Sequence, residues 1–194
     1  FVANAVSGIL NEHFSRYSRK INLISFGRRS NDLMDKILAI KNDSTLVETH
    51  DGSSKILTGS VFNDSTILLF DSILNFKENS VVHPIKFNRF NHLLFIHDAM
   101  PDDFMSLDER YSKPAVNFLL KESEQSIKLL TSFTFAENKC ESNQLVVINH
   151  FEKSNMTWKT SRFYPEKYLN LNKCKLKVGT YDGVHLEYRP VSYT

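Results

Sequence analysis

Short strand-like runs rich in large apolar residues alternate with helix-spaced stretches, and this pattern restricts the fold of the chain most. Such runs occur at 20–26, 66–70 and 93–97. Strands that are apolar on both faces are typical of sheets covered by helices on both sides. Between them, apolar residues recur every three or four positions over 4–17 and again after Ser30, a residue type suited to cap a helix. The first half therefore predicts a small Rossmann-like open α/β sheet with flanking helices.

The second half of the chain is typical of antiparallel sheet. Residues 116–121 and 127–135 are strand-like and are joined by a short polar link, which predicts a β-hairpin. The apolar run 145–148 predicts a further strand or a buried helix end, and 156–159 can pair back on it across a polar turn. A last strand is expected over 176–181. The expected fold class is thus α/β, with a β-hairpin region after the Rossmann-like sheet.

Charge and hydropathy exclude several classes of partner. The 194 residues include 24 basic and 22 acidic side chains, a formal net charge of +2, so a nucleic-acid partner is not indicated. No apolar run approaches the ~20 residues of a membrane span. Residues 152–194 are enriched in basic side chains, which indicates a boundary near Pro165. Because the chain opens on Phe1 without an initiator Met or signal peptide, we expect a piece of a longer protein. Targeting signals and membrane spans would then lie in its other segments.

Motifs of catalysis and of cofactor binding are absent from the sequence. The six glycines form neither GxGxxG nor GxxxxGK, and neither GxSxG nor HExxH occurs. His92 and His97 are expected to be ordinary residues of a sheet rather than ligands of one metal. We therefore expect no catalytic residue, no metal and no cofactor. The loop after 93–97 is acidic but lacks the ligand spacing and central Gly of a calcium site, which favours a solvated loop: Asp98, Asp102, Asp103, Asp108 and Glu109.

Two cysteines and three Asn-x-Ser/Thr acceptors leave the cellular compartment open. Cys140 and Cys174 are compatible with one disulfide, which would stabilise the fold by about 3–4 kcal/mol, or with two unrelated buried thiols. The acceptors are Asn42, Asn63 and Asn155. Chance alone predicts roughly 2.7 such patterns in a chain of this composition, so the acceptors by themselves do not indicate secretion.

An ordered set of short motifs over 127–181 carries a family resemblance. After a Phe-rich strand, the set runs Cys140, Gln144-Leu145-Val146-Val147-Ile148-Asn149-His150-Phe151, Trp158, Phe163-Tyr164-Pro165-Glu166-Lys167, Asn170-Leu171, Cys174 and Leu176-Lys177-Val178-Gly179-Thr180-Tyr181. In this order the motifs resemble the insect chemosensory ionotropic receptors, relatives of the ionotropic glutamate receptors. Residues 21–25 and 31–33 are similar to the first strand and helix of their amino-terminal region.

The resemblance implies an extracellular amino-terminal domain over 1–173, followed by the first strand of a bilobed ligand-binding domain over 174–194. It implies a chemosensory ligand-gated cation channel, assembled from several receptor subunits, that a small-molecule ligand opens. Membrane segments would lie outside this chain. The chain itself would lie on the extracellular side of the plasma membrane, support assembly or ligand access, and catalyse nothing.

Secretion, implied by the same resemblance, favours a Cys140–Cys174 disulfide and makes the three Asn acceptors usable. The segment after the predicted last strand lacks a Pro that family members usually carry there, a departure from the pattern of amino-acid-binding receptors. Tyr181 and Tyr188 are candidates for the wall of a ligand cleft.

Two other classes of function remain open at this stage. One is a soluble α/β module that holds a small ligand at the carboxyl ends of the strands near Asp98, and it predicts a closed, saturable pocket. The other is a transferase-like enzyme with an unrecognised site, which predicts titratable groups of perturbed pKa converging in a cleft.

Overall fold

The computed structural model describes residues 1–18, 20–41, 46–52, 64–82, 91–105, 116–133, 135–136, 139–140, 145–165, 176–179 and 188–191. Its helical segments are α1 (Val2–Ile9), the π-helical η1 (Leu10–Phe14), α2 (Ser15–Tyr17), α3 (Arg28–Ile40), α4 (Ile73–Val82) and α5 (Pro101–Met105). Its strands are β1 (Lys20–Phe26), β2 (Leu46–Asp51), β3 (Ser65–Phe70), β4 (His92–Ile96), β5 (Val116–Lys121), β6 (Ser126–Ser132), β7 (Phe135–Ala136), β8 (Lys139–Cys140), β9 (Leu145–Glu152), β10 (Thr157–Trp158), β11 (Leu176–Gly179) and β12 (Tyr188–Val191).

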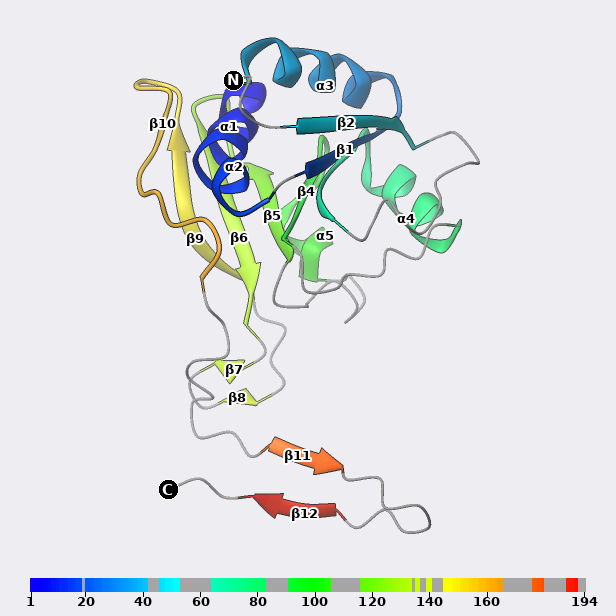
Figure 1. The fold of residues 1–194 in the computed structure, drawn as a ribbon, viewed down its shortest axis with the longest axis vertical. Helices are drawn as coiled ribbons and strands as arrows, with labels where there is room; N and C mark the ends of the chain where they lie inside the picture. The colour runs from blue at the N-terminus through cyan, green and yellow to red at the C-terminus, as the bar shows by residue number, and fades with distance from the viewer. Residues whose placement is uncertain are drawn as a thin grey trace.

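One open eight-stranded sheet organises the described residues, in the order β10-β9-β6-β5-β4-β3-β1-β2 (Figure 1). The strands from β2 to β5 run parallel. The strands from β5 to β10 pair antiparallel, and β7-β8 and β11-β12 form two small separate sheets. The predicted Rossmann-like open α/β sheet is confirmed. The predicted hairpin is also present, as β5 and β6.

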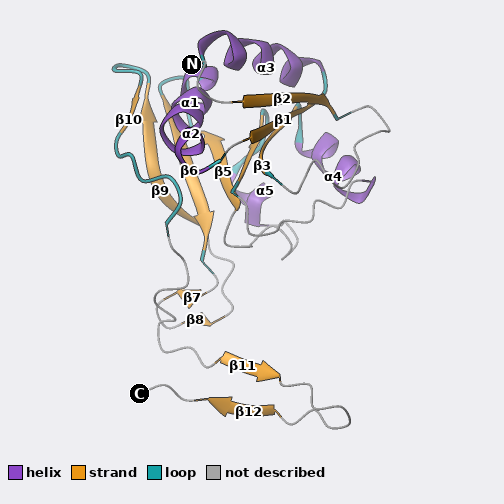
Figure 2. Ribbon diagram, in the orientation of Figure 1, coloured by secondary structure: helices purple, strands orange, loops and turns teal. Residues whose placement is uncertain are grey.

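Helices cover both faces of the sheet (Figure 2). Successive side chains of a strand point to opposite faces, so each parallel strand packs against helices on both sides. On one face, Leu23 and Phe95 belong to a core that also takes in buried residues of α1, η1 and α3. On the other face, Phe26 and Phe70 stack with ring centroids 4.3 Å apart, and Phe76 of α4 packs against Phe70. Burial on both faces explains why these strands are apolar throughout.

Trp158 fixes the N-terminal helix to the last strand of the sheet. Its indole N–H donates a hydrogen bond of 3.0 Å to the carbonyl oxygen of Ala5 in α1. Gly8 leaves room for the ring, since a Cβ at this position would lie 3.0 Å from the indole Cδ1. Phe151 and Phe163 pack edge-on against the indole, with ring centroids 5.3 and 5.6 Å away. Residues from the two ends of the domain thus close one core together.

The π-helical turn places His13 against the segment that follows β10. The imidazole stacks on Tyr164 with ring centroids 4.5 Å apart, and the Asn91 amide donates to its Nε2 over 2.9 Å. Burial lowers the pKa of His13 to about 4. The Tyr164 hydroxyl in turn donates to the carbonyl of His92, the first residue of β4. This contact joins the segment after β10 to the middle of the sheet.

Three expectations about local structure can be compared with the observed helices and strands. The expected cap at Ser30 is wrong, because α3 begins at Arg28 and Ser30 lies inside its first turn. The run 145–148, for which the sequence predicts either a strand or a buried helix end, belongs to strand β9. The expected return of 156–159 is confirmed, as β10 pairs antiparallel with β9.

Candidate functional site

The strand order places a topological switch point between β1 and β3. From β1 the chain crosses to β2 on one side, and β3 then joins the other side of β1. The helices that follow these two strands cover opposite faces, since α3 contributes Leu33 and Ile37 to one core and α4 contributes Phe76 to the other. In open α/β sheets, ligands bind in the crevice outside the carboxyl ends of the strands at such a point. The residues that end β1, β3 and β4 are therefore the candidate site.

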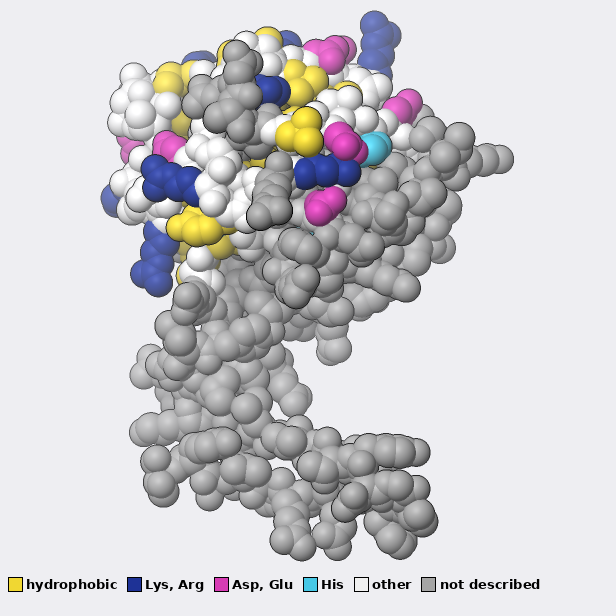
Figure 3. All heavy atoms as spheres, viewed as in Figure 1, with side chains coloured by type: hydrophobic (Ala, Val, Ile, Leu, Met, Phe, Trp, Pro, Cys, Tyr) yellow, Lys and Arg dark blue, Asp and Glu magenta, His cyan; other side chains and the backbone are white. Residues whose placement is uncertain are grey.

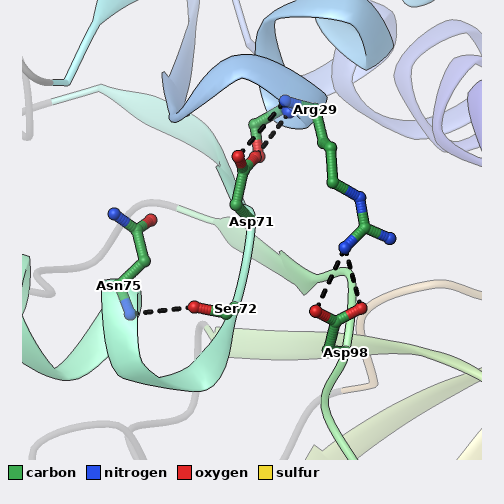
Figure 4. Close-up of polar contacts among 6 residues, drawn as sticks. Arg29, Asp71, Ser72, Asn75 and Asp98 are labelled. Atoms are coloured by element: carbon green, nitrogen blue, oxygen red, sulfur yellow. Dashed lines mark hydrogen bonds and ion pairs between the residues drawn. The ribbon is translucent and has the colours of Figure 1, made fainter.

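Asp71, directly after β3, caps helix α3 from a neighbouring strand (Figure 4). One carboxylate oxygen accepts the backbone N–H of Arg29 over 3.2 Å, and the other accepts that of Ser30 over 2.7 Å. These N–H groups belong to the first turn of the helix, where no preceding carbonyl of the helix can accept a hydrogen bond from them. The positive end of the helix dipole adds to the attraction. Asp71 therefore occupies the anion position that a helix start provides.

Gly27 makes this cap feasible. Its backbone φ of 108° lies in a region that residues with a side chain rarely adopt. In addition, a Cβ at this position would lie 2.4 Å from Oδ2 of Asp71. Any other residue would push the carboxylate away from the helix or strain the backbone. The turn between β1 and α3 thus depends on a glycine for two independent reasons.

Arg29 and Asp98 form an ion pair at the edge of the sheet, beside the Asp71 cap (Figure 4). The Nη1 of Arg29 donates to both carboxylate oxygens of Asp98, at 2.9 and 3.1 Å. The two side chains are 56% and 54% exposed, so solvent screens the pair and it contributes little to stability. Both contacts use one nitrogen, which leaves Nε and Nη2 to meet a ligand at this edge.

His97 directly follows β4, and the charges of Arg29, Asp71 and Asp98 all act on its imidazole. Burial lowers the pKa of its imidazole, and the Arg29 guanidinium lowers it further, although the carboxylates of Asp71 and Asp98 oppose both effects. Partial burial raises the pKa of Asp71, but hydrogen bonds from Ser30 and Arg29 outweigh this and hold it below its ordinary value. The carboxylate is therefore ionised and the imidazole neutral at pH 7. We call Arg29, Asp71, His97 and Asp98 the carboxyl-edge cluster.

The carboxyl-edge cluster offers hydrogen bonds and charge rather than metal ligation. Within the described residues, no group of three or more His, Cys, Asp or Glu side chains is placed to hold a metal ion. The face seen in Figure 3 intermixes acidic, basic and apolar side chains, without a broad patch of one charge among the coloured residues. The arrangement can orient a small polar ligand through the Arg29 guanidinium, whose backbone is held by Asp71.

Comparison with known proteins decides the family. A family model described as "Putative ionotropic receptor, ligand binding domain" matches residues 1–170. The chain belongs to this ionotropic receptor family. No curated protein and no solved structure matches it.

In this ionotropic receptor domain, the structure reaches only part of the predicted site. Asn42, Asn63, Cys174 and Tyr181 lie outside the described residues, as do Asp108 and Glu109 of the acidic loop. Cys140 ends β8, Tyr188 begins β12, and Asn155 is exposed in the turn between β9 and β10. The Cys140–Cys174 disulfide, the glycosylation of the three Asn residues and the cleft role of the two Tyr residues stay predictions. So does the division of the chain at 173.

Three histidine and aspartate positions of the receptor domain can be compared with expectation. His92 is a fully buried residue of β4, as expected of a sheet histidine, and burial lowers its pKa to about 4. Asp98 is not merely solvated, because it pairs with Arg29. Asp103 accepts the backbone N–H of Met100 at the start of α5. No helix in the described segments is both long and apolar enough to cross a membrane.

The sequence analysis does not single out Arg29 and Asp71, although the chain carries a signal for a capped helix start at this place. Two adjacent basic residues, Arg28 and Arg29, open α3, just ahead of the helix expected after Ser30, and the helix dipole disfavours positive charge at such a start. Such a start calls for an anion from elsewhere in the fold. Gly27, between an apolar strand and a helix, marks the place where another group approaches the backbone closely.

Proposed function

We propose that this chain is the extracellular part of a chemosensory ligand-gated cation channel of the insect ionotropic receptor type, and that its ligand meets the carboxyl-edge cluster. The single observation behind the ligand site is the exposed Arg29–Asp98 pair at the switch point of the sheet. Family membership supports a receptor role that binds a small molecule. The chain supports assembly with other subunits or ligand access, and performs no catalysis.

The geometry favours a ligand that competes for Arg29. The backbone at Arg29 is held by Asp71, so the guanidinium starts from a fixed point. Its ion pair with Asp98 is exposed and weak, so a ligand that replaces Asp98 as the partner of Arg29 sacrifices little favourable free energy. A polar acceptor on the ligand would gain a charge-assisted hydrogen bond from Nε or Nη2.

Gating follows if ligand binding favours one arrangement of two lobes over another. A ligand shifts such an equilibrium only by its difference in affinity for the two arrangements. In this proposal, residues 1–173 form the domain described above and 174–194 begin a second lobe. A Cys140–Cys174 disulfide would tie the two together, and Tyr181 and Tyr188 would face the cleft. Pore helices would follow in the longer protein.

Ligand-evoked current in the full-length receptor tests the proposal. The receptor is expressed with its partner subunits in oocytes and exposed to a panel of small odorants and tastants. We expect Arg29→Ala to raise the half-maximal concentration about tenfold, which corresponds to ~1.4 kcal/mol. Arg28→Ala is the matched control, since Arg28 is an exposed neighbour, and we expect a change below about twofold, as for an exposed charge.

Two outcomes would contradict parts of the proposal. An unchanged half-maximal concentration for Arg29→Ala, with normal surface expression, would remove the cluster as the ligand site. The absence of any ligand-gated cation current from the assembled wild-type receptor across the panel would contradict the channel role itself.

A further inference from the structure

The tip of the β9–β10 hairpin carries an Asn acceptor within the described residues. Asn155-Met156-Thr157 spans the end of the four-residue turn 153–156 and the first residue of β10. The Met156 N–H donates to the Glu152 carbonyl over 2.9 Å, which closes the turn. Met156 has a φ of 53°, so the chain reverses direction sharply within the acceptor motif.

Exposure distinguishes a usable acceptor from a chance match. Asn155 and Thr157 are both exposed, as are the other residues of the turn. Just beyond the tip the hairpin is anchored, because Phe151 and Trp158 are buried and pair across the two strands. The motif therefore projects from a rigid support into open space. N-linked sugars require such a position, because a bulky, hydrophilic glycan cannot be buried.

We propose that Asn155 carries an N-linked glycan. This rests on the extracellular placement proposed above, since the sugar is added on the secretory route. In the transfer, the Asn155 amide nitrogen forms a bond to C1 of an oligosaccharide carried on a polyisoprenyl diphosphate. The bond from C1 to the phosphate oxygen breaks, the diphosphate leaves with its electrons, and the amide loses one proton. Nothing is oxidised or reduced.

A glycan at this position has a consequence for assembly. Met156 is 40% exposed beside the acceptor, and the sugar would cover this apolar side chain. Lys153 lies over the ring of Phe1, 5.9 Å from its centroid, so the glycan stands next to the start of the domain. A hydrated glycan here keeps partner subunits away from the β10 edge of the sheet.

Site-resolved mass spectrometry of the full-length receptor, purified from a secretory host, tests the proposal. Treatment with an N-glycosidase in H₂¹⁸O marks each formerly glycosylated Asn as ¹⁸O-labelled Asp, and we expect the mark at residue 155. Asn155→Gln and Thr157→Ala should each lose one glycan on a gel, whereas Thr157→Ser should keep it because the acceptor motif survives. Ser154→Ala is a control for a harmless change in the same turn. An external epitope tag on unpermeabilised cells reports the orientation of the domain separately.

The readouts separate the two proposals. A surface-exposed domain with no label at Asn155, whether or not Asn42 or Asn63 is labelled, overturns the glycan and leaves the extracellular placement intact. A tag that stains only after permeabilisation, in a receptor present at the plasma membrane, overturns the extracellular placement together with the glycan. A label at Asn155 that survives in Thr157→Ala also overturns the assignment to this motif.

Discussion

The cap that Asp71 places on α3 makes a quantitative prediction about stability. Asp71→Ala removes hydrogen bonds to the N–H groups of Arg29 and Ser30. Loss of a helix cap costs about 0.5–2 kcal/mol, and loss of a negative charge at the helix start costs about 0.3–1 kcal/mol more. We therefore expect the free energy of unfolding to fall by ~1–3 kcal/mol at pH 7. Urea denaturation followed by circular dichroism measures it.

The pH dependence of the unfolding free energy tests whether the ionised carboxylate of Asp71 provides this stabilisation. The pKa of folded Asp71 lies below its ordinary value of 3.8, so its stabilisation is complete well above 3.8 and is lost as the pH falls through the folded value. The difference in unfolding free energy between the wild type and Asp71→Asn should therefore narrow in acid. Asp98→Ala is the matched control, because its exposed pair with Arg29 contributes at most about 1 kcal/mol.

A double-mutant cycle with Gly27 provides the decisive comparison. Gly27→Ala alone lowers the unfolding free energy for two reasons: the backbone is strained, and the new Cβ clashes with the Asp71 carboxylate. In the Asp71→Ala background the clash is relieved and only the strain remains, so the two losses should add to more than the loss in the double variant. Strictly additive losses, or an Asp71→Ala variant as stable as the wild type, would refute the idea that Gly27 exists to admit the cap.

Three further outcomes are expected of the same domain. Gly8→Val should lower the unfolding free energy by about 1–3 kcal/mol, since the added atoms meet the Trp158 indole, whereas a wild-type-like midpoint in urea would show that the indole can move. Trp158→Phe should cost about 2–4 kcal/mol through lost packing and the lost hydrogen bond to Ala5, and a loss below 1 kcal/mol would be too small for this contact. His13 and His92 have folded pKa values of about 4 against an ordinary 6.5, so the stability present above pH 6.5 should decline as the pH falls toward 4. His13→Gln should flatten that decline in denaturation curves measured across this range, and an unaltered slope would contradict the burial of a neutral imidazole.

The sequence predicts the strands of this fold well because they are buried on both faces. The runs at 20–26, 66–70 and 93–97 agree closely with β1, β3 and β4. The sequence also predicts the pairing of strands that are close in the chain. The β5–β6 hairpin and the antiparallel pairing of β10 with β9 each need only a short link. In each case, the decisive information lies within a few neighbouring residues.

Contacts between distant segments could not be predicted in this way. The first turn of α3 contains Ser30, whose residue type suggests a local cap, yet the cap comes from Asp71, 41 positions away. The Arg29–Asp98 pair spans 69 positions, and the bond from Trp158 to Ala5 spans 153. The sequence identifies Asp98 as one member of an acidic loop, but its partner depends on the order of β1, β3 and β4, which no local pattern specifies.

The self-supplied cap also limits the chemistry of any ligand at the switch point. In many α/β proteins the start of the first helix after β1 is open and binds a phosphate or another anion. Here Asp71 already satisfies the N–H groups of Arg29 and Ser30, so an anionic ligand would first have to displace a covalently tethered carboxylate. The Arg29 side chain carries no such tether, because its pair with Asp98 is more than half exposed. Recognition at this edge therefore falls to the guanidinium rather than to the helix start, which is why Arg29→Ala, and not a change in the backbone of α3, is the informative variant.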